Sequence, residues 1–174
     1  MKRFRFLVVL VGLVASLIWL GFRFWPSNEN VVKSRLNDLA ETLSYTKPEG
    51  VIRQSIRVHR LVEFFTSDVL IDLSGVSMGR GRLGGVIQGR EGLSLSLRAM
   101  PEEFRSLNVE FVDVLVQVAP DQGSATAFAS ALIAAEMDRS RRRETTAAQE
   151  LKFELKRNGA TWEIARVVTY RTLQ

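Results

Sequence analysis

Residues 144–170, ETTAAQELKFELKRNGATWEIARVVTY, are the part of the sequence that predicts the fold most clearly. From residue 145 to residue 155, apolar or small side chains alternate with polar and charged ones. A period of two is typical of a β-strand with one buried face. Asn158-Gly159 is a strong signal for a tight hairpin turn. The segment after the turn alternates again, at Trp162, Ile164, Val168 and Tyr170. The stretch therefore predicts two antiparallel strands joined by a hairpin.

The two segments before this stretch predict two further strands of the same sheet. Residues 108–118 are apolar on both faces over much of their length, and residues 120–123, Pro-Asp-Gln-Gly, are typical of a turn. Residues 124–137 are a long, alanine-rich segment that predicts the next strand. Its recurring small side chains either leave room inside the fold or allow a partner to pack closely. They are Ala125, Ala127, Ala129 and Ala131.

The first half of the chain beyond residue 27 predicts mainly helices. Residues 46–49, Thr-Lys-Pro-Glu, fit a capping box with proline in the first helical turn. No regular alternation of strand and helix is present, so a parallel doubly wound sheet is not expected. We predict an α+β fold, in which three helices pack on a strongly curved, mostly antiparallel sheet. The elements expected before the last four strands are helices at 28–45, 49–65 and 90–100 and strands at 68–73 and 83–88.

The N-terminal segment has a different composition from the rest of the chain. Residues 6–22, FLVVLVGLVASLIWLGF, are uncharged, and a helix of this length rises about 25 Å, close to the hydrocarbon thickness of a bilayer. Lys2, Arg3 and Arg5 precede the run, so the positive-inside rule places the N-terminus in the cytoplasm. A cleaved signal peptide is the alternative. However, a cleavage site requires small residues after the apolar run, and residues 20–26 are mostly bulky and include a basic one. We therefore predict a transmembrane anchor at 1–26 and an extracytoplasmic domain at 27–174, held at the inner membrane.

Charge and composition exclude several classes of function. The net charge is +5, but residues 1–25 contain four basic side chains and no acidic ones, so the remaining domain is close to neutral. A nucleic-acid partner is therefore not expected. The chain has no cysteine and one histidine, and we expect neither a metal nor a disulfide. Residues 79–84 match G-x-G-x-x-G but lack the flanking strand and helix of a dinucleotide site, so no cofactor is expected.

Several phrases of the sequence, together with the order of the predicted elements, resemble the nuclear transport factor 2-like superfamily, which includes the SnoaL-like cyclases and ketosteroid isomerase. The phrases are VEFFTSDV at 62–69, GREGL at 89–93, VEFVDV at 109–114 and GATWEI at 159–164. The resemblance implies a cone-shaped α+β roll that encloses a pocket, with homodimerisation through the sheet. Some members are enzymes, and many are binding or scaffold domains.

The candidate site residues follow from this expected pocket. By analogy with the isomerases and dehydratases of the superfamily, we considered a general acid–base site, which requires a carboxylate or histidine and an oxyanion donor. The weak catalytic candidates are Asp113, Tyr170 and His59, with Asp72 as a further base. The residues expected to line the pocket are Phe111, Gln149, Leu151, Phe153, Trp162, Arg166 and Tyr170.

Three functional hypotheses remain at this point. The first is a membrane-anchored, extracytoplasmic binding or scaffold domain without catalytic activity, partnered by a second copy or an envelope protein and holding a small apolar ligand. The alternative is an isomerase, dehydratase or cyclase that acts on a small apolar molecule in the cone. The third is a subunit of an envelope secretion complex, since an anchor followed by such a domain is similar to the inner-membrane scaffold of type IV secretion systems.

Overall fold

The structure is a computed structural model that describes residues 27–46, 50–74, 77–78, 81–82, 85–137 and 144–170. The described helices are α2 (Asn28–Leu43), α3 (Val51–Val62) and α4 (Gly89–Glu103). The strands are β1 (Phe65–Asp72), β2 (Ser77–Met78), β3 (Gly81–Arg82), β4 (Val86–Gln88), β5 (Phe104–Val118), β6 (Ser124–Met137), β7 (Glu144–Asn158) and β8 (Thr161–Thr169).

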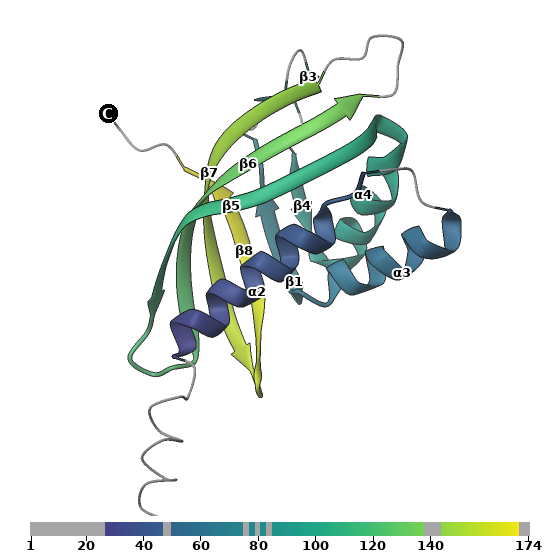
Figure 1. The fold of residues 1–174 in the computed structure, drawn as a ribbon. Helices are drawn as coiled ribbons and strands as arrows, with labels where there is room; N and C mark the ends of the chain where they lie inside the picture. Colours follow the sequence, from purple (N-terminus) through teal and green to yellow (C-terminus); the bar gives the residue numbers. More distant parts are fainter. Residues whose placement is uncertain are drawn as a thin grey trace, which may run out of the picture.

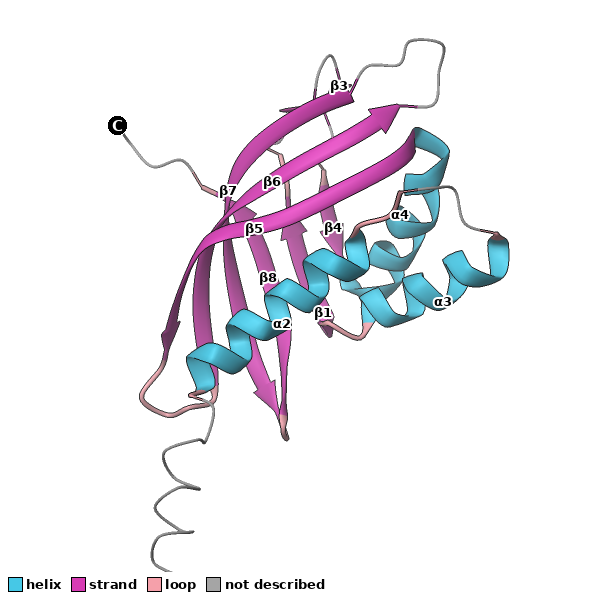
Figure 2. Ribbon diagram, viewed as in Figure 1, coloured by secondary structure: helices cyan, strands magenta, loops and turns pink. Residues whose placement is uncertain are grey.

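Six of these strands form one curved sheet. Its order is β4-β1-β8-β7-β6-β5, and every neighbouring pair is antiparallel except β1 and β8, which are parallel. The three helices lie on the concave side of the sheet, and α2 runs across it (Figure 1). Colouring by secondary structure shows the same segregation of helices from strands (Figure 2). The predicted α+β class, with three helices on a mostly antiparallel sheet, is confirmed.

The strand register determines which side chains enter the cone. Ala127 is paired with Phe153, and Ala131 is paired with Gln149, so these four residues share one face of the sheet. That face carries the buried side chains, and we call it the inner face. Phe128 is paired with Lys152 and belongs to the opposite, outer face. The alanine stripe predicted on β6 is therefore buried against the core, where its small side chains leave volume for larger neighbours.

Buried apolar side chains form two clusters at opposite ends of the inner face. The larger cluster includes Trp162, Phe153 and Ile164, which are at most 2% exposed, together with residues of α2, α3 and α4. We call this region the Trp162 end, where β7 meets β8. The smaller cluster lies where β5 and β7 begin and β6 ends, and we call it the Tyr45 end. Its buried members are Tyr45, Phe104, Leu107 and Ala135.

The start of the second helix differs from the sequence-based expectation. The second helix begins at Val51 with Gly50 as its N-cap, and no side chain caps it, so the predicted capping role of Thr46 is wrong. Glu49 and Pro48 lie outside the described residues. Asp113 interrupts the apolar pattern of its segment, which favours an edge or bulge residue, and the structure confirms this: Asp113 has a φ of 54° at a bulge in the pairing of β5 with β6.

The membrane anchor predicted at residues 6–22 lies outside the described residues. Among the helices that the structure does describe, none combines the length and the apolar character needed to cross a bilayer.

Candidate functional site

Tyr45 is positioned by the way in which the chain leaves α2. Ser44 ends the helix, and its hydroxyl oxygen accepts a hydrogen bond of 2.9 Å from the backbone N–H of Val109 on the edge strand β5. Tyr45 then exchanges two backbone hydrogen bonds with Leu107, of 2.7 and 2.8 Å. Directly paired residues of an antiparallel ladder point to the same side. Tyr45 therefore points to the inner face with Leu107, and its hydroxyl donates a hydrogen bond of 2.9 Å to the carbonyl oxygen of Phe104.

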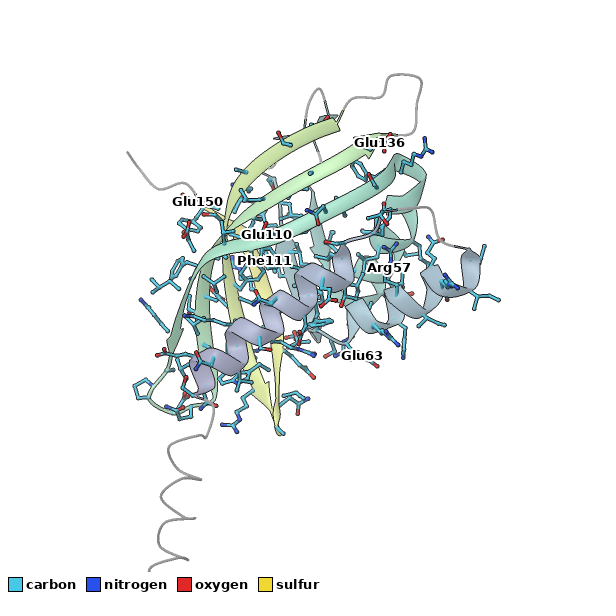
Figure 3. The ribbon with its side chains drawn as sticks, in the orientation of Figure 1. Arg57, Glu63, Glu110, Phe111, Glu136 and Glu150 are labelled. Carbon is cyan, nitrogen blue, oxygen red and sulfur yellow. The ribbon has the colours of Figure 1, made fainter. Side chains whose placement is uncertain are left out.

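Arg57 approaches the same place from α3. Its guanidinium carbon lies 4.2 Å from the centre of the Tyr45 ring, which is the geometry of a cation–π contact. The Nε and Nη1 atoms of Arg57 are shielded from solvent although the residue as a whole is only half-buried. In Figure 3 the labelled Arg57 lies among the helices on the concave side of the sheet. A guanidinium whose nitrogens are shielded from solvent interacts more strongly with a nearby negative charge, because little water screens the interaction.

The side chains that the described strands bring beside this pair are apolar or uncharged. Val109, Ile133 and Ala147 pack against the buried residues of the Tyr45 end. Gln149 is half-buried on the inner face opposite Ala131, and its side-chain amide donates to the carbonyl oxygen of Glu150 at 3.3 Å. The described strands place no Asp, Glu or His on the inner face. The Arg57 guanidinium is a charged group at this end, and a guanidinium is suited to stabilising negative charge on a bound oxygen.

The structure packs four of the predicted pocket residues together. Phe111, Leu151, Phe153 and Trp162 all belong to the larger cluster and are buried. The rings of Phe111 and Phe153 meet edge to face, with their centres 5.3 Å apart. Gln149 shares their face at the boundary with the Tyr45 end. That these residues line a ligand pocket stays a prediction, and in the structure the four buried ones belong to the larger cluster rather than to the Tyr45 end.

Arg166 and Tyr170 are placed on the other side of the sheet, so the prediction that they line the interior is wrong. Arg166 is paired with Glu154 on the outer face, and the ring of Tyr170 packs edge to face on Phe128 at 5.4 Å between centres. Burial against the sheet raises the pKa of Tyr170 above its ordinary value, and the Glu150 carboxylate raises it further. Tyr170 is therefore more firmly protonated than a free tyrosine, but it is remote from the inner wall.

The remaining catalytic candidates are also separated from the interior. His59 is on α3, 81% exposed, with its Nε2 atom 3.4 Å from the Glu63 carboxylate. Asp113 is exposed at the β5 bulge. Asp72 is on the outer side of β1, where the hydroxyl and the backbone N–H of Ser74 donate to its carboxylate and lower its pKa. The structure therefore does not bring His59, Asp113, Asp72 and Tyr170 together into an acid–base site.

Local sequence patterns do not indicate that Tyr45 and Arg57 meet. Arg57 shares a helical stripe with Arg53 and Arg60, which favours an exposed position for all three. Tyr45 is one of only two tyrosines and directly follows the last residues of α2, so it was interpreted as the end of a helix. Its position at the edge of β5 depends on a long-range backbone pairing that no local pattern indicates. Within the described part of the chain, no three His, Cys, Asp or Glu side chains come close enough to hold a metal ion.

The cone of helices on a curved sheet is shared with solved structures of known fold. A protein from Novosphingobium aromaticivorans provisionally named a scytalone dehydratase superposes with a TM-score of 0.61, at 12% identity over 81% of this chain and 83% of that chain. A provisionally named aromatic ring hydroxylase from the same species gives 0.66, at 14% identity over 86% and 93%. A provisionally named polyketide cyclase from Xanthomonas campestris gives 0.50, at 15% identity over 84% and 93%.

The family follows from the sequence itself. The SnoaL-like domain family matches residues 49–168, which is more than half of the chain. The chain belongs to this family, and the predicted resemblance to the nuclear transport factor 2-like superfamily is confirmed. No functionally curated protein matches the sequence.

These findings correct the leading functional hypothesis. A membrane-anchored binding or scaffold domain without catalytic activity was the first expectation, but the three solved structures of the same fold carry the names of enzymes. They favour the alternative that was stated beside it, an isomerase, dehydratase or cyclase. The inner-membrane location and the protein partners are not tested by the described residues and stay predictions.

Proposed function

We propose that this chain is an enzyme of the isomerase, dehydratase or cyclase type, which acts on a small apolar carbonyl compound at the Tyr45 end of the cone. The observation that carries the proposal is the Arg57 guanidinium, held 4.2 Å above the Tyr45 ring with two of its nitrogens shielded from solvent. The enzyme names of the solved neighbours support this class of reaction.

The three reaction types share a chemical demand. Each proceeds through removal of a proton from the carbon next to a carbonyl group, and the electron pair of the broken C–H bond moves onto the carbonyl oxygen as an enolate. Positive groups aimed at that oxygen lower the barrier because the charge forms only during the reaction. Arg57 supplies this positive charge in the proposal, and the apolar side chains of Val109, Ile133 and Phe111 hold the carbon skeleton.

Tyr45 has a positioning role in the proposal. Its ring lies under the guanidinium, and its hydroxyl is fixed by the Phe104 carbonyl, so the aromatic face limits the directions in which Arg57 can point. In the proposal, the residues at the Tyr45 end stabilise the negative charge of the enolate oxygen and bind the carbon skeleton of the substrate. Because the described strands place no carboxylate or histidine on the inner face, the proton passes in this proposal to a solvent water molecule, which completes the step.

The test uses a panel of aromatic and alicyclic ketones and β-hydroxy ketones. Loss of water is followed by mass spectrometry, and double-bond migration is followed by ultraviolet absorbance. We expect turnover of at least one class by the wild-type chain, and Arg57→Gln should lower its kcat/KM by about 10²–10³. Arg57→Lys should retain part of the activity because it keeps the charge but loses the planar fork. His59→Gln, on the exposed side of α3, is the matched control and should leave turnover unchanged. Equal turnover by wild type and Arg57→Gln would contradict the proposal.

A further inference from the structure

A second concave surface lies between α3 and α4, apart from the Tyr45 end. It is a groove of about 870 Å³, and neither Tyr45 nor Arg57 lines it. Three of its side chains are large, apolar and strongly exposed: Val51 at 82%, Ile52 at 77% and Ile56 at 51%. Exposed apolar residues gathered in a groove are uncommon on a monomer and indicate an interaction site.

The exposure arises because α3 has two apolar sides. Val58 and Leu61 point into the core, and the helix is fixed to the fold through them. Ile52 and Ile56 lie on another side, where the described residues leave them in contact with solvent, and Val51 is exposed in the first turn of the helix. A surface helix normally has one apolar stripe that faces its core. The second apolar side of α3 therefore predicts a second packing partner.

The charges around the groove restrict the chemistry of that partner. Arg60 on α3 and Arg98 on α4 both line the groove, and within the described residues neither forms an ion pair. The acidic residue of the lining is Glu63, which is already 3.4 Å from His59. A second copy of the same surface would place like charges against each other, which is unfavourable. The groove is complementary to an acidic surface.

We propose that the α3–α4 groove binds an acidic amphipathic α-helix of a partner protein. The 12 residues of α3 span about 18 Å, which matches about three turns of a helix laid alongside it. Apolar side chains of the partner at positions i, i+4 and i+7 cover Ile52 and Ile56. Carboxylates beside that stripe pair with Arg60 and Arg98. This binding is independent of the proposed reaction at the Tyr45 end.

The probe is a synthetic 18-residue helical peptide with a leucine stripe flanked by glutamates, labelled with fluorescein. A second peptide replaces every glutamate by lysine and keeps the leucines. Fluorescence anisotropy measures the binding of both peptides to the full chain. We expect the glutamate peptide to bind and the lysine peptide to bind at least about tenfold more weakly. Affinity for the glutamate peptide should fall as salt is raised, because the rim charges are exposed.

Substitutions then locate the binding surface. Ile56→Asp should weaken binding of the glutamate peptide more than about tenfold, since it removes a buried apolar contact and adds a like charge. Arg98→Glu should weaken it about threefold and improve binding of the lysine peptide. Leu132→Asp is the matched control, because Leu132 is an exposed apolar residue (41%) on the outer face of β6. It should leave peptide binding unchanged, and circular dichroism checks that all variants are folded.

Four results would overturn the inference. Absence of glutamate-peptide binding, or equal binding by the wild-type chain and Ile56→Asp, would remove the groove as a helix site. A dimer in sedimentation velocity that Ile56→Asp converts to a monomer would assign the groove to a second copy. Flotation with phosphatidylglycerol vesicles that Ile56→Asp abolishes, without peptide binding, would assign it to a lipid surface.

Discussion

The two ends of the cone differ in what their side chains offer. The Trp162 end is filled by apolar side chains, and its largest residues, Trp162 and Phe153, are each 2% exposed. The Tyr45 end has a smaller buried cluster, and a phenol hydroxyl and a guanidinium lie within and over it. Burying polar groups costs free energy unless they are paired, whereas burying apolar surface is favourable. Stabilising apolar burial is therefore concentrated at the Trp162 end, and the polar groups that the proposed reaction uses lie at the Tyr45 end.

The largest expected effect is on the Trp162 end. Trp162→Ala removes a fully buried side chain and leaves a cavity, so the free energy of unfolding should fall by about 3–5 kcal/mol. Urea denaturation followed by circular dichroism measures the change. A loss below about 1 kcal/mol would show that this end does not dominate stability.

The next effect concerns the alanine stripe. Ala129 is 2% exposed and is paired with Leu151 on the inner face, so Ala129→Leu should overpack the core and cost about 1–3 kcal/mol. Ser130→Leu, the neighbouring residue on the outer face, is the control and should cost less. Urea midpoints of the two variants measured together give the comparison. A larger loss for Ser130→Leu would reverse the assignment of the two faces.

The same strands show why part of the structure was predictable. Most of β7 follows a regular alternation, so its faces could be assigned from the sequence, whereas the alanine stripe of β6 left open whether it faces the interior or a partner. β8 does not alternate regularly, because a register shift separates the pair Glu154–Arg166 from the pair Leu155–Ile164. A one-residue irregularity turns every later side chain to the other face. Trp162 and Ile164 are therefore inside as predicted, whereas Tyr170 is outside.

The site was less predictable than the fold for a related reason. Arg57 becomes partly buried only because Tyr45 lies beneath it, and Tyr45 is held by its pairing with Leu107, more than 60 residues later in the chain. Helical periodicity reports which residues share a side of α3, but not which other segment covers that side. The shared stripe with Arg53 and Arg60 therefore favoured a solvated position for Arg57.

A smaller effect is expected from the Tyr45 hydroxyl. Tyr45→Phe removes the donor to the Phe104 carbonyl, and the free energy of unfolding should fall by about 1 kcal/mol. Tyr170→Phe, the other tyrosine, is a control on the outer face and should cost less. Thermal unfolding of the two variants measures the difference. Equal losses would indicate that the hydroxyl bond at the Tyr45 end contributes nothing particular to stability.

The smallest effect is electrostatic and lies outside both ends. Hydrogen bonds from Ser74 hold the pKa of Asp72 below 3.8, its ordinary value. Because the folded-state pKa is depressed, this contribution to stability is present above the unfolded-state pKa and is lost as the pH falls through the folded-state pKa. Ser74→Ala should move the pKa of Asp72 upward toward 3.8, as measured by NMR titration of the carboxyl carbon. An unchanged pKa would show that Ser74 is not the cause.

The division of roles between the two ends is tested most directly by measuring stability and turnover on the same preparation of Arg57→Gln. The account predicts a loss of kcat/KM of about 10²–10³ with a change in the free energy of unfolding of about 1 kcal/mol, the size of one cation–π contact. A variant that unfolds much more easily yet turns over substrate at the wild-type rate would contradict it, because Arg57 would then stabilise the fold and take no part in the chemistry.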